Sequence, residues 1–106
     1  MEGILKPRGR PKKVRLVGRK PQIEQFSPRG KPGRPDEAEI TIDQLETLRL
    51  VDYSGMSQID AAKSMGLSRQ TVGRILKEAR RNITDGLING KIIRICGGKI
   101  RLKKEA

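Results

Sequence analysis

A stretch of 20 residues, from Gln58 to Lys77, limits most strongly what this chain can fold into. Its apolar residues have the spacing of two short helices that pack across a sharp corner: Ala61, Ala62, Met65, Leu67, Val72 and Ile75. Ser57 and Ser68 can each accept a hydrogen bond from the backbone at the start of one helix. Gly66 lies where the first helix must end, and glycine adopts the left-handed conformation of such a turn at little cost. The stretch therefore predicts two helices joined at a corner.

Two helices in this arrangement are typical of a helix-turn-helix unit, whose second helix enters the major groove of DNA. An ordinary helical hairpin is the alternative. Arginine can form paired hydrogen bonds with guanine and glutamine with adenine, so three exposed residues of the second helix are predicted to read bases: Arg69, Gln70 and Arg74. Six neighbouring side chains are predicted to contact the DNA backbone: Ser57, Ser68, Thr71, Lys77, Arg80 and Arg81. A solvated surface role is the alternative for each arginine.

A helix is also predicted before this pair, beginning at Thr41. Thr41 and Gln44 have the spacing of a capping box, and Gly55 ends the pattern. An apolar face recurs at helical spacing in between, formed by Ile42, Leu45, Leu48 and Val51, and broadened by Leu50 and Tyr53. We expect this face to complete the core of a three-helix domain spanning residues 38–90. The last helix is expected to continue to about Ile88.

Residues 1–37 form a basic segment rich in proline and glycine, which is expected to be largely irregular. Within it, one run is similar to the core of an AT-hook: Arg8, Gly9, Arg10, Pro11, Lys12 and Lys13. A narrow Arg-Gly-Arg-Pro backbone fits the minor groove of A·T tracts, where the negative potential favours arginine. The alternative is a basic arm that contacts phosphates without entering the groove.

Residues 91–106 form a basic tail in which apolar and basic residues alternate around Gly97 and Gly98. This pattern favours a small β-hairpin, although an extended tail fits equally well. The predicted fold class is therefore mainly α. It consists of a three-helix helix-turn-helix domain, an irregular N-terminal arm, and a short C-terminal hairpin or extended tail.

Charge makes nucleic acid the first partner to consider, because the 106 residues carry a formal net charge of +12. The excess is uneven. Residues 1–35 hold eleven Lys or Arg and two acids. Residues 36–67 hold two Lys or Arg and seven acids, and residues 68–106 hold eleven Lys or Arg and three acids. The basic charge thus precedes the predicted three-helix unit and begins again at its last helix.

Chemistry that needs histidine or paired cysteines is excluded, because the chain has no histidine and a single cysteine, Cys96. The remaining residues form no acid–base pair or nucleophile set, so we predict no enzyme, no metal site and no cofactor. No apolar run is long enough for a signal peptide or a membrane span. A cytoplasmic location with no membrane partner is expected.

The chain also resembles a small family of uncharacterised prokaryotic proteins, for which a helix-turn-helix like region four of sigma factors is predicted. The likeness covers about residues 10–98 and is carried by short runs: 10–13, 26–32, 43–50, 57–58, 61–62, 65–66, 68–71, 73–76, 79–81 and 89–91. The resemblance implies DNA binding and no catalytic activity. Many members carry cysteines where this chain has Val14 and Gly18, so a metal or redox role of the arm is in doubt here.

These observations together predict a homodimeric protein that binds double-stranded DNA in a sequence-specific way and regulates transcription. One alternative is a module that docks on RNA polymerase through the acidic surface of residues 36–60, with Asp43, Glu46 and Asp52 as the contact residues. Another is an RNA-binding protein that uses its basic tails.

Overall fold

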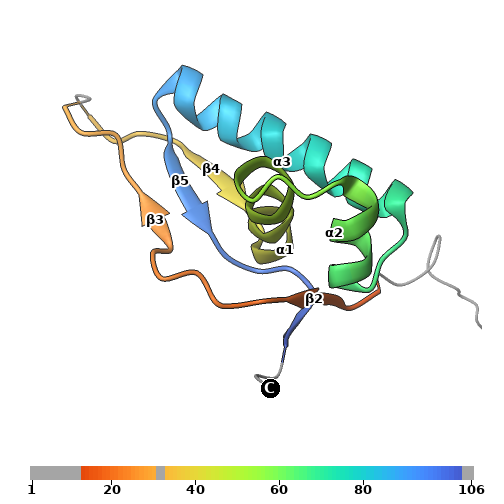
Figure 1. Ribbon diagram of the computed structural model, residues 1–106. Helices are drawn as coiled ribbons and strands as arrows, with labels where there is room; N and C mark the ends of the chain where they lie inside the picture. Colours follow the sequence, from red (N-terminus) through yellow and green to blue (C-terminus); the bar gives the residue numbers. More distant parts are fainter. Residues whose placement is uncertain (1–12, 31–32, 104–106) are drawn as a thin grey trace, which may run out of the picture.

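The computed structural model describes residues 13–30 and 33–103, which form nine helical and strand elements (Figure 1). In chain order these are β2 (Arg15–Val17), β3 (Gln25–Phe26), β4 (Glu37–Ile40), α1 (Ile42–Thr47), the π-helix η1 (Leu48–Tyr53), α2 (Gln58–Met65), α3 (Arg69–Asn89), β5 (Ile92–Ile95) and β6 (Ile100–Leu102). Helix α3 lies along one side of the β4–β5 pair, and α1 lies between these strands and α2 (Figure 1).

The predicted mainly α class is wrong. Helices hold 46% of the described residues and strands hold 18%, arranged in two sheets, so the fold is α/β. Strands β2 and β3 arise from the segment expected to be irregular, and β5 and β6 arise from the tail. Each of these strands has only two to four residues. They become regular because each finds a partner far away in the sequence.

The larger sheet joins the N-terminal segment to the tail in the order β3-β5-β4. Strand β5 is antiparallel to β3 and parallel to β4. Parallel neighbours need a crossover connection, and all four helical elements lie in this one. Alternate residues of β4 and β5 are buried in the core, namely Ala38, Ile40, Ile93 and Ile95.

The predicted hairpin between β5 and β6 is also wrong, because β6 pairs in parallel with β2 in a separate sheet. Gly97 and Gly98 both have positive φ, yet they do not form a hairpin turn between paired strands. The Gly97 carbonyl accepts a hydrogen bond of 3.0 Å from the Ile42 N–H at the start of α1. A Cβ on Gly98 would lie 2.5 Å from Asp43 Oδ1. Gly98 is therefore needed for close packing against α1, whereas Gly97 is favoured by its positive φ alone.

Helices α2 and α3 follow their predicted local design. Ser57 Oγ accepts a hydrogen bond from the Asp60 N–H, and Ser68 Oγ accepts one from the Thr71 N–H. Gly66 ends α2 with φ at 70°. The two helices enclose a cluster of fully or nearly buried residues, Leu50, Ala61, Ala62, Met65 and Val72. The corner and both of its caps are present.

The distal half of α3 packs on the sheet. Gly86 is buried there, and a Cβ at this position would lie 2.7 Å from Ile93 Cγ1 on β5. The residue allows the helix to approach the strands closely. This contact explains why α3 continues for 21 residues.

Helix α1 buries the opposite face from the one that we expected. Its buried residues are polar or charged: Asp43, Gln44, Glu46 and Thr47. Of the expected apolar face, Ile42, Leu45 and Leu48 line an open groove. Leu50 is buried in the core as expected, and Val51 packs against it. Tyr53, expected at the edge of the core, is 88% exposed. The reason is that β2 and the residue after it provide polar partners for α1. Arg15 faces Asp43, and the Gly18 N–H donates to Glu46 Oε2 at 2.9 Å.

Candidate nucleic-acid interface

The outer face of α3 carries a stripe of exposed polar and basic side chains. The core face of its first half is fixed by four buried residues, Val72, Ile75, Leu76 and Ala79. At 100° per residue, the opposite face holds Gln70, Arg74, Lys77 and Arg81, and all four are exposed. Arg69 is exposed beside them in the first turn. Two of the three predicted base readers, Gln70 and Arg74, thus share one surface with two predicted backbone contacts.

The start of this stripe is held by the N-terminal cap of α3. The hydroxyls of Ser68 and Thr71 lie 2.9 Å apart, and Ser68 Oγ also accepts from the Thr71 N–H at 3.2 Å. Ser57 has the same capping role at the start of α2. These three residues were predicted as backbone contacts, and their hydroxyl oxygens are already used to hold the two helix starts in place.

The Arg80 side chain is held away from the stripe by an ion pair with Asp52. Its Nε and Nη2 donate to the two carboxylate oxygens of Asp52 on η1, at 3.1 and 2.7 Å. The same contact lowers the pKa of the Asp52 carboxyl and raises the pKa of Arg80. Arg80 therefore ties α3 to η1, whereas Arg81 projects into solvent.

Gly73 faces the side chain of Gln58 on α2, a contact that the sequence did not indicate. A Cβ at this position would lie 3.3 Å from Gln58 Oε1 on α2. The glycine thus lies at the contact between the two helices, close to the polar stripe. Only the tertiary structure shows that Gln58 approaches it.

The AT-hook-like run lies almost wholly outside the described residues, namely Arg8, Gly9, Arg10, Pro11 and Lys12. Lys13 is described and is exposed, two residues before β2. Because β2 pairs with β6, the basic arm joins the domain beside the basic tail.

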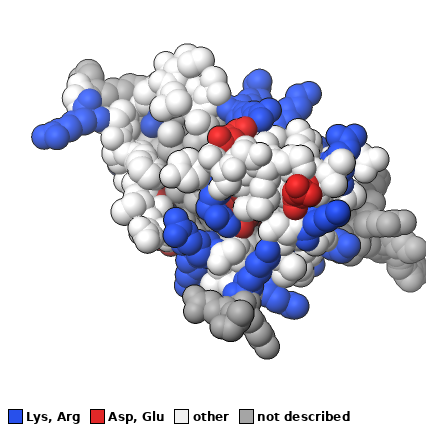
Figure 2. Space-filling view, in the orientation of Figure 1, with Lys and Arg blue, Asp and Glu red and all other residues white. Residues whose placement is uncertain are grey.

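Three further basic residues lie close to the corner between α2 and α3: Lys99, Arg101 and Lys103, all exposed. Lys103 Nζ donates to Ser64 Oγ in the last turn of α2, at 2.7 Å. In the face shown in Figure 2, basic side chains gather in the lower part of the molecule. The alternation of basic and apolar residues in the tail was visible in the sequence, but its position beside α2 was not.

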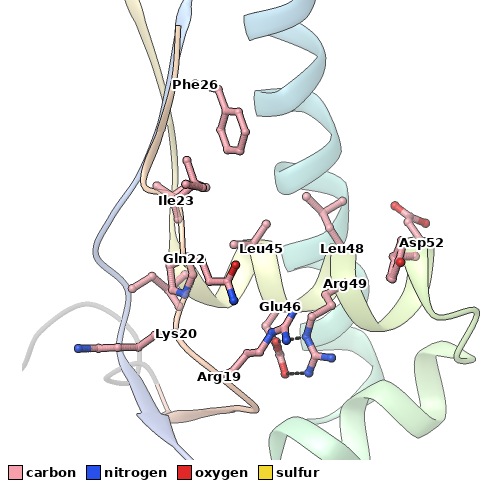
Figure 3. Close-up of a pocket in the computed structure, with 14 residues that line it drawn as sticks. Arg19, Lys20, Gln22, Ile23, Phe26, Leu45, Glu46, Leu48, Arg49 and Asp52 are labelled. Carbon is pink, nitrogen blue, oxygen red and sulfur yellow. Dashed lines mark hydrogen bonds and ion pairs between the residues drawn. The ribbon is translucent and has the colours of Figure 1, made fainter.

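A groove of about 550 Å³ lies on the other side of α1. Figure 3 shows its floor, with Leu45 and Leu48 from the helices and Ile23 and Phe26 from the opposite segment. Ile23 and Phe26 are each 54% exposed, so both side chains remain accessible in the groove. The groove gives the domain an apolar surface away from the polar stripe of α3.

Two of the three acids predicted to contact RNA polymerase are buried. Asp43 and Glu46 are 5% and 3% exposed, and both are engaged inside the domain. Asp43 faces Arg15 with 3.6 Å between Oδ2 and Nη1, and Glu46 binds Arg49 through both carboxylate oxygens. Asp52 is bound by Arg80. Two of the three acids therefore stabilise the fold and are inaccessible to a partner.

The family described as "Protein of unknown function DUF134" matches residues 4–103, almost the whole chain. The chain belongs to the DUF134 family. A UPF0251 protein of Methanococcus vannielii is 48% identical over 98 residues, which is 92% of this chain and 75% of the relative. A UPF0251 protein of Prosthecochloris aestuarii is 43% identical over 98 residues, which is 92% of this chain and 63% of the relative. No solved structure matches.

Membership of DUF134 confirms the family that the sequence resemblance suggested, at the level of an uncharacterised prokaryotic group. The sigma-like helix-turn-helix stays a prediction. Among residues 13–30 and 33–103, no helix is long and apolar enough to cross a membrane.

Proposed function

We propose that this DUF134 chain is a sequence-specific DNA-binding protein that regulates transcription and reads the major groove with α3. One observation carries the proposal. Directly after the Gly66 corner, α3 turns one face into the core through Val72 and Leu76 and exposes Gln70 and Arg74 on the other. A helix fixed on one face and polar on the opposite face can be inserted into a groove without loss of core contacts.

Each side chain of the stripe has a definite role in this proposal. Arg69 and Arg74 bind guanine through O6 and N7, and Gln70 binds adenine through N6 and N7. Lys77 and Arg81, further along α3, bind phosphates, and Arg80 holds α3 in place through Asp52. Ser57, Ser68 and Thr71 hold the helix starts in position, so that the N-terminal ends of α2 and α3 face the DNA backbone.

The proposal includes a homodimer, since two copies can bind two half-sites on one duplex. The groove in Figure 3 suits a second copy, because its floor is apolar. Arg19 and Lys20 lie on one edge, and Asp52 lies on the other. The Asp52 side chain keeps 41% of its surface exposed beside Arg80. A two-fold axis through the groove would bury the apolar floors of the two copies against each other.

A cytoplasmic location belongs to the same proposal, since transcriptional regulators of prokaryotes act on DNA in the cytoplasm. Polymerase docking through Asp43 and Glu46 is not favoured, because both side chains are buried. RNA binding remains an outcome that the experiment below can reveal.

The test is selection of bound duplexes from a random DNA pool, with three proteins in parallel. They are the wild type, the Arg69→Ala/Gln70→Ala variant, and a matched Gln25→Ala/Arg29→Ala control on the segment before β4. We expect the wild type and the control to enrich the same motif and the α3 variant to lose it. Truncation of two base-contacting side chains should weaken binding to that motif by about 30- to 25,000-fold, at about 1–3 kcal/mol per good bidentate contact.

Other outcomes would contradict the proposal in distinct ways. Enrichment of A·T-rich DNA by both α3 variant and wild type would show that the arm dominates and that α3 reads no bases. Failure of the wild type to enrich any duplex, with tight binding of structured RNA at equal salt, would replace DNA by RNA as the partner.

A further inference from the structure

The β2–β6 pair is a ribbon built from the two basic ends of the chain, and it lies against the corner between α2 and α3. Its register pairs Leu16 with Arg101. Directly paired residues of neighbouring strands lie on the same face of a sheet. Leu16 Cδ1 lies 3.6 Å from the position that a Cβ on Gly66 would occupy. Arg101 therefore shares the face of the ribbon that is turned toward the corner.

The residues on either side of β6 bring two further cations to this place. The Lys99 carbonyl accepts from the Arg15 N–H at 3.0 Å, and the Lys103 N–H donates to the Val17 carbonyl at 2.9 Å. Lys103 Nζ also reaches Ser64 Oγ on α2, at 2.7 Å. Main-chain pairing thus fixes the three cations along one ribbon, with Lys103 beside the end of α2 and Lys99 at the other end, next to Arg15.

Most of the exposed charge on the ribbon and at the start of α3 is positive. The ribbon strands Arg15–Val17 and Ile100–Leu102, with the flanking Lys99 and Lys103, contain no acid. The first nine residues of α3 carry Arg69, Arg74 and Lys77, and the first acid of that helix is Glu78. Cations on both sides of one corner match the closely spaced phosphates of a duplex.

We propose that the β2–β6 ribbon is a second DNA-contacting element, in which Lys99, Arg101 and Lys103 bind phosphates beside the groove entered by α3. The inference rests on the proposed function, because it uses the same duplex. The ribbon side chains are cations at alternating exposed positions, and none of them is an amide. They therefore add affinity and fix the position of the protein on the duplex, and do not discriminate between bases. Their contribution is therefore expected in the salt dependence of binding, whereas α3 determines the motif.

The experiment compares Arg101→Gln/Lys103→Gln with Arg29→Gln/Arg34→Gln, which removes the same charge from exposed positions before β4. Full-length proteins are titrated with a random-sequence duplex and with the selected motif over a range of salt concentrations. Each lost phosphate contact lowers the slope of log K against log salt by about 0.9, so we expect the ribbon variant to lose about 1.8. The control should keep the slope of the wild type, and both variants should select the wild-type motif.

The controls separate this inference from the proposed function. If the wild type binds no duplex, the proposed function fails. If the wild type binds and the α3 variant loses the motif, but the ribbon variant keeps the wild-type slope, only the ribbon inference fails. If the ribbon variant loses affinity for structured RNA and not for DNA, the ribbon binds RNA and the proposal is overturned.

A structural loss in the ribbon variant is recognised by a lower midpoint of thermal unfolding. For that case the single Arg101→Gln variant provides the test, because Arg101 is exposed and its main-chain pairing with β2 does not depend on its side chain. We expect a slope lower by about 0.9 with an unchanged midpoint. An unchanged slope in this variant would contradict the inference.

Discussion

For single residues, two glycines of α3 differ in how much room an added side chain would have. Gly86 faces the buried Ile93, and an added Cβ would lie 2.7 Å from Cγ1 and 3.0 Å from Cδ1 of that side chain. Gly73 faces only the end of the Gln58 side chain, at 3.3 Å. A buried branched residue between helix and sheet cannot move away as easily as an amide group on a half-buried helix surface.

We predict that Gly86→Ala destabilises the domain while Gly73→Ala does not. Overpacking costs about 1–3 kcal/mol, against a gain of about 1 kcal/mol in helix propensity, so Gly86→Ala should lower the free energy of unfolding by about 1 kcal/mol. Gly73→Ala should leave the free energy of unfolding equal to that of the wild type or raise it. Urea unfolding followed by circular dichroism measures both. Equal stability of the two variants would contradict the predicted contact of Gly86 with β5.

The buried pair of Arg15 and Asp43 gives a second prediction at this scale. Their side chains are only 9% and 7% exposed, and Arg15 Nε and Asp43 Oδ1 have no hydrogen-bond partner in the described part of the chain. Asp43→Asn should cost about 3 kcal/mol, because it leaves the arginine charge buried without a counter-charge. Adding Arg15→Met should recover part of that loss.

Denaturant unfolding of the two single variants and the double variant tests this coupling. An exposed Asp36→Asn variant is the matched control and should change stability by less than about 0.5 kcal/mol. Additive losses in the double variant would show that the two side chains do not interact.

At the scale of elements, α3 is held to η1 by the exposed pair of Arg80 and Asp52. The Arg80 hydrogen bonds lower the pKa of Asp52 below its ordinary value of 3.8. A carboxyl with a lowered folded-state pKa stabilises the fold above its unfolded pKa, and this stabilisation is lost as the pH falls through the folded pKa. The pair therefore acts at neutral pH and disappears in acid.

We predict that Arg80→Gln lowers the free energy of unfolding at pH 7 by up to about 1 kcal/mol, the range of a solvent-screened surface pair. The difference from the wild type should shrink as the pH falls below 3.8. Urea unfolding at a series of pH values measures it. A difference that stays constant down to the acid limit would show that Arg80 stabilises α3 through packing alone.

At the scale of the whole molecule, the domain has two separate surfaces, the basic corner with α3 and the apolar groove beside α1. The groove is lined by the α1 residues whose spacing predicted a core position. If two copies associate through it, both corners remain free to bind a duplex. The dimer and the DNA interface are then independent in mutational tests.

We predict that Leu48→Glu converts a dimer into a monomer, because it places a charge on the apolar floor of the groove. Leu87→Glu is the matched control, since Leu87 is 71% exposed near the end of α3 and does not line the groove. Sedimentation equilibrium of the wild type and both variants distinguishes the states. A monomeric wild type, or dissociation by both variants alike, would rule out the groove as the dimer contact.

The caps at Ser57 and Ser68, the Gly66 corner and the exposed face of α3 could be predicted from the sequence, because they depend on neighbours within a few residues. The two sheets and the buried face of α1 could not. Strands of two to four residues have almost no periodicity, and their partners are distant: Glu37 and Arg94 meet across 57 positions. Because β2 and the residue after it place Arg15 and the Gly18 N–H against α1, the polar face of α1 is buried and its apolar face lines the groove.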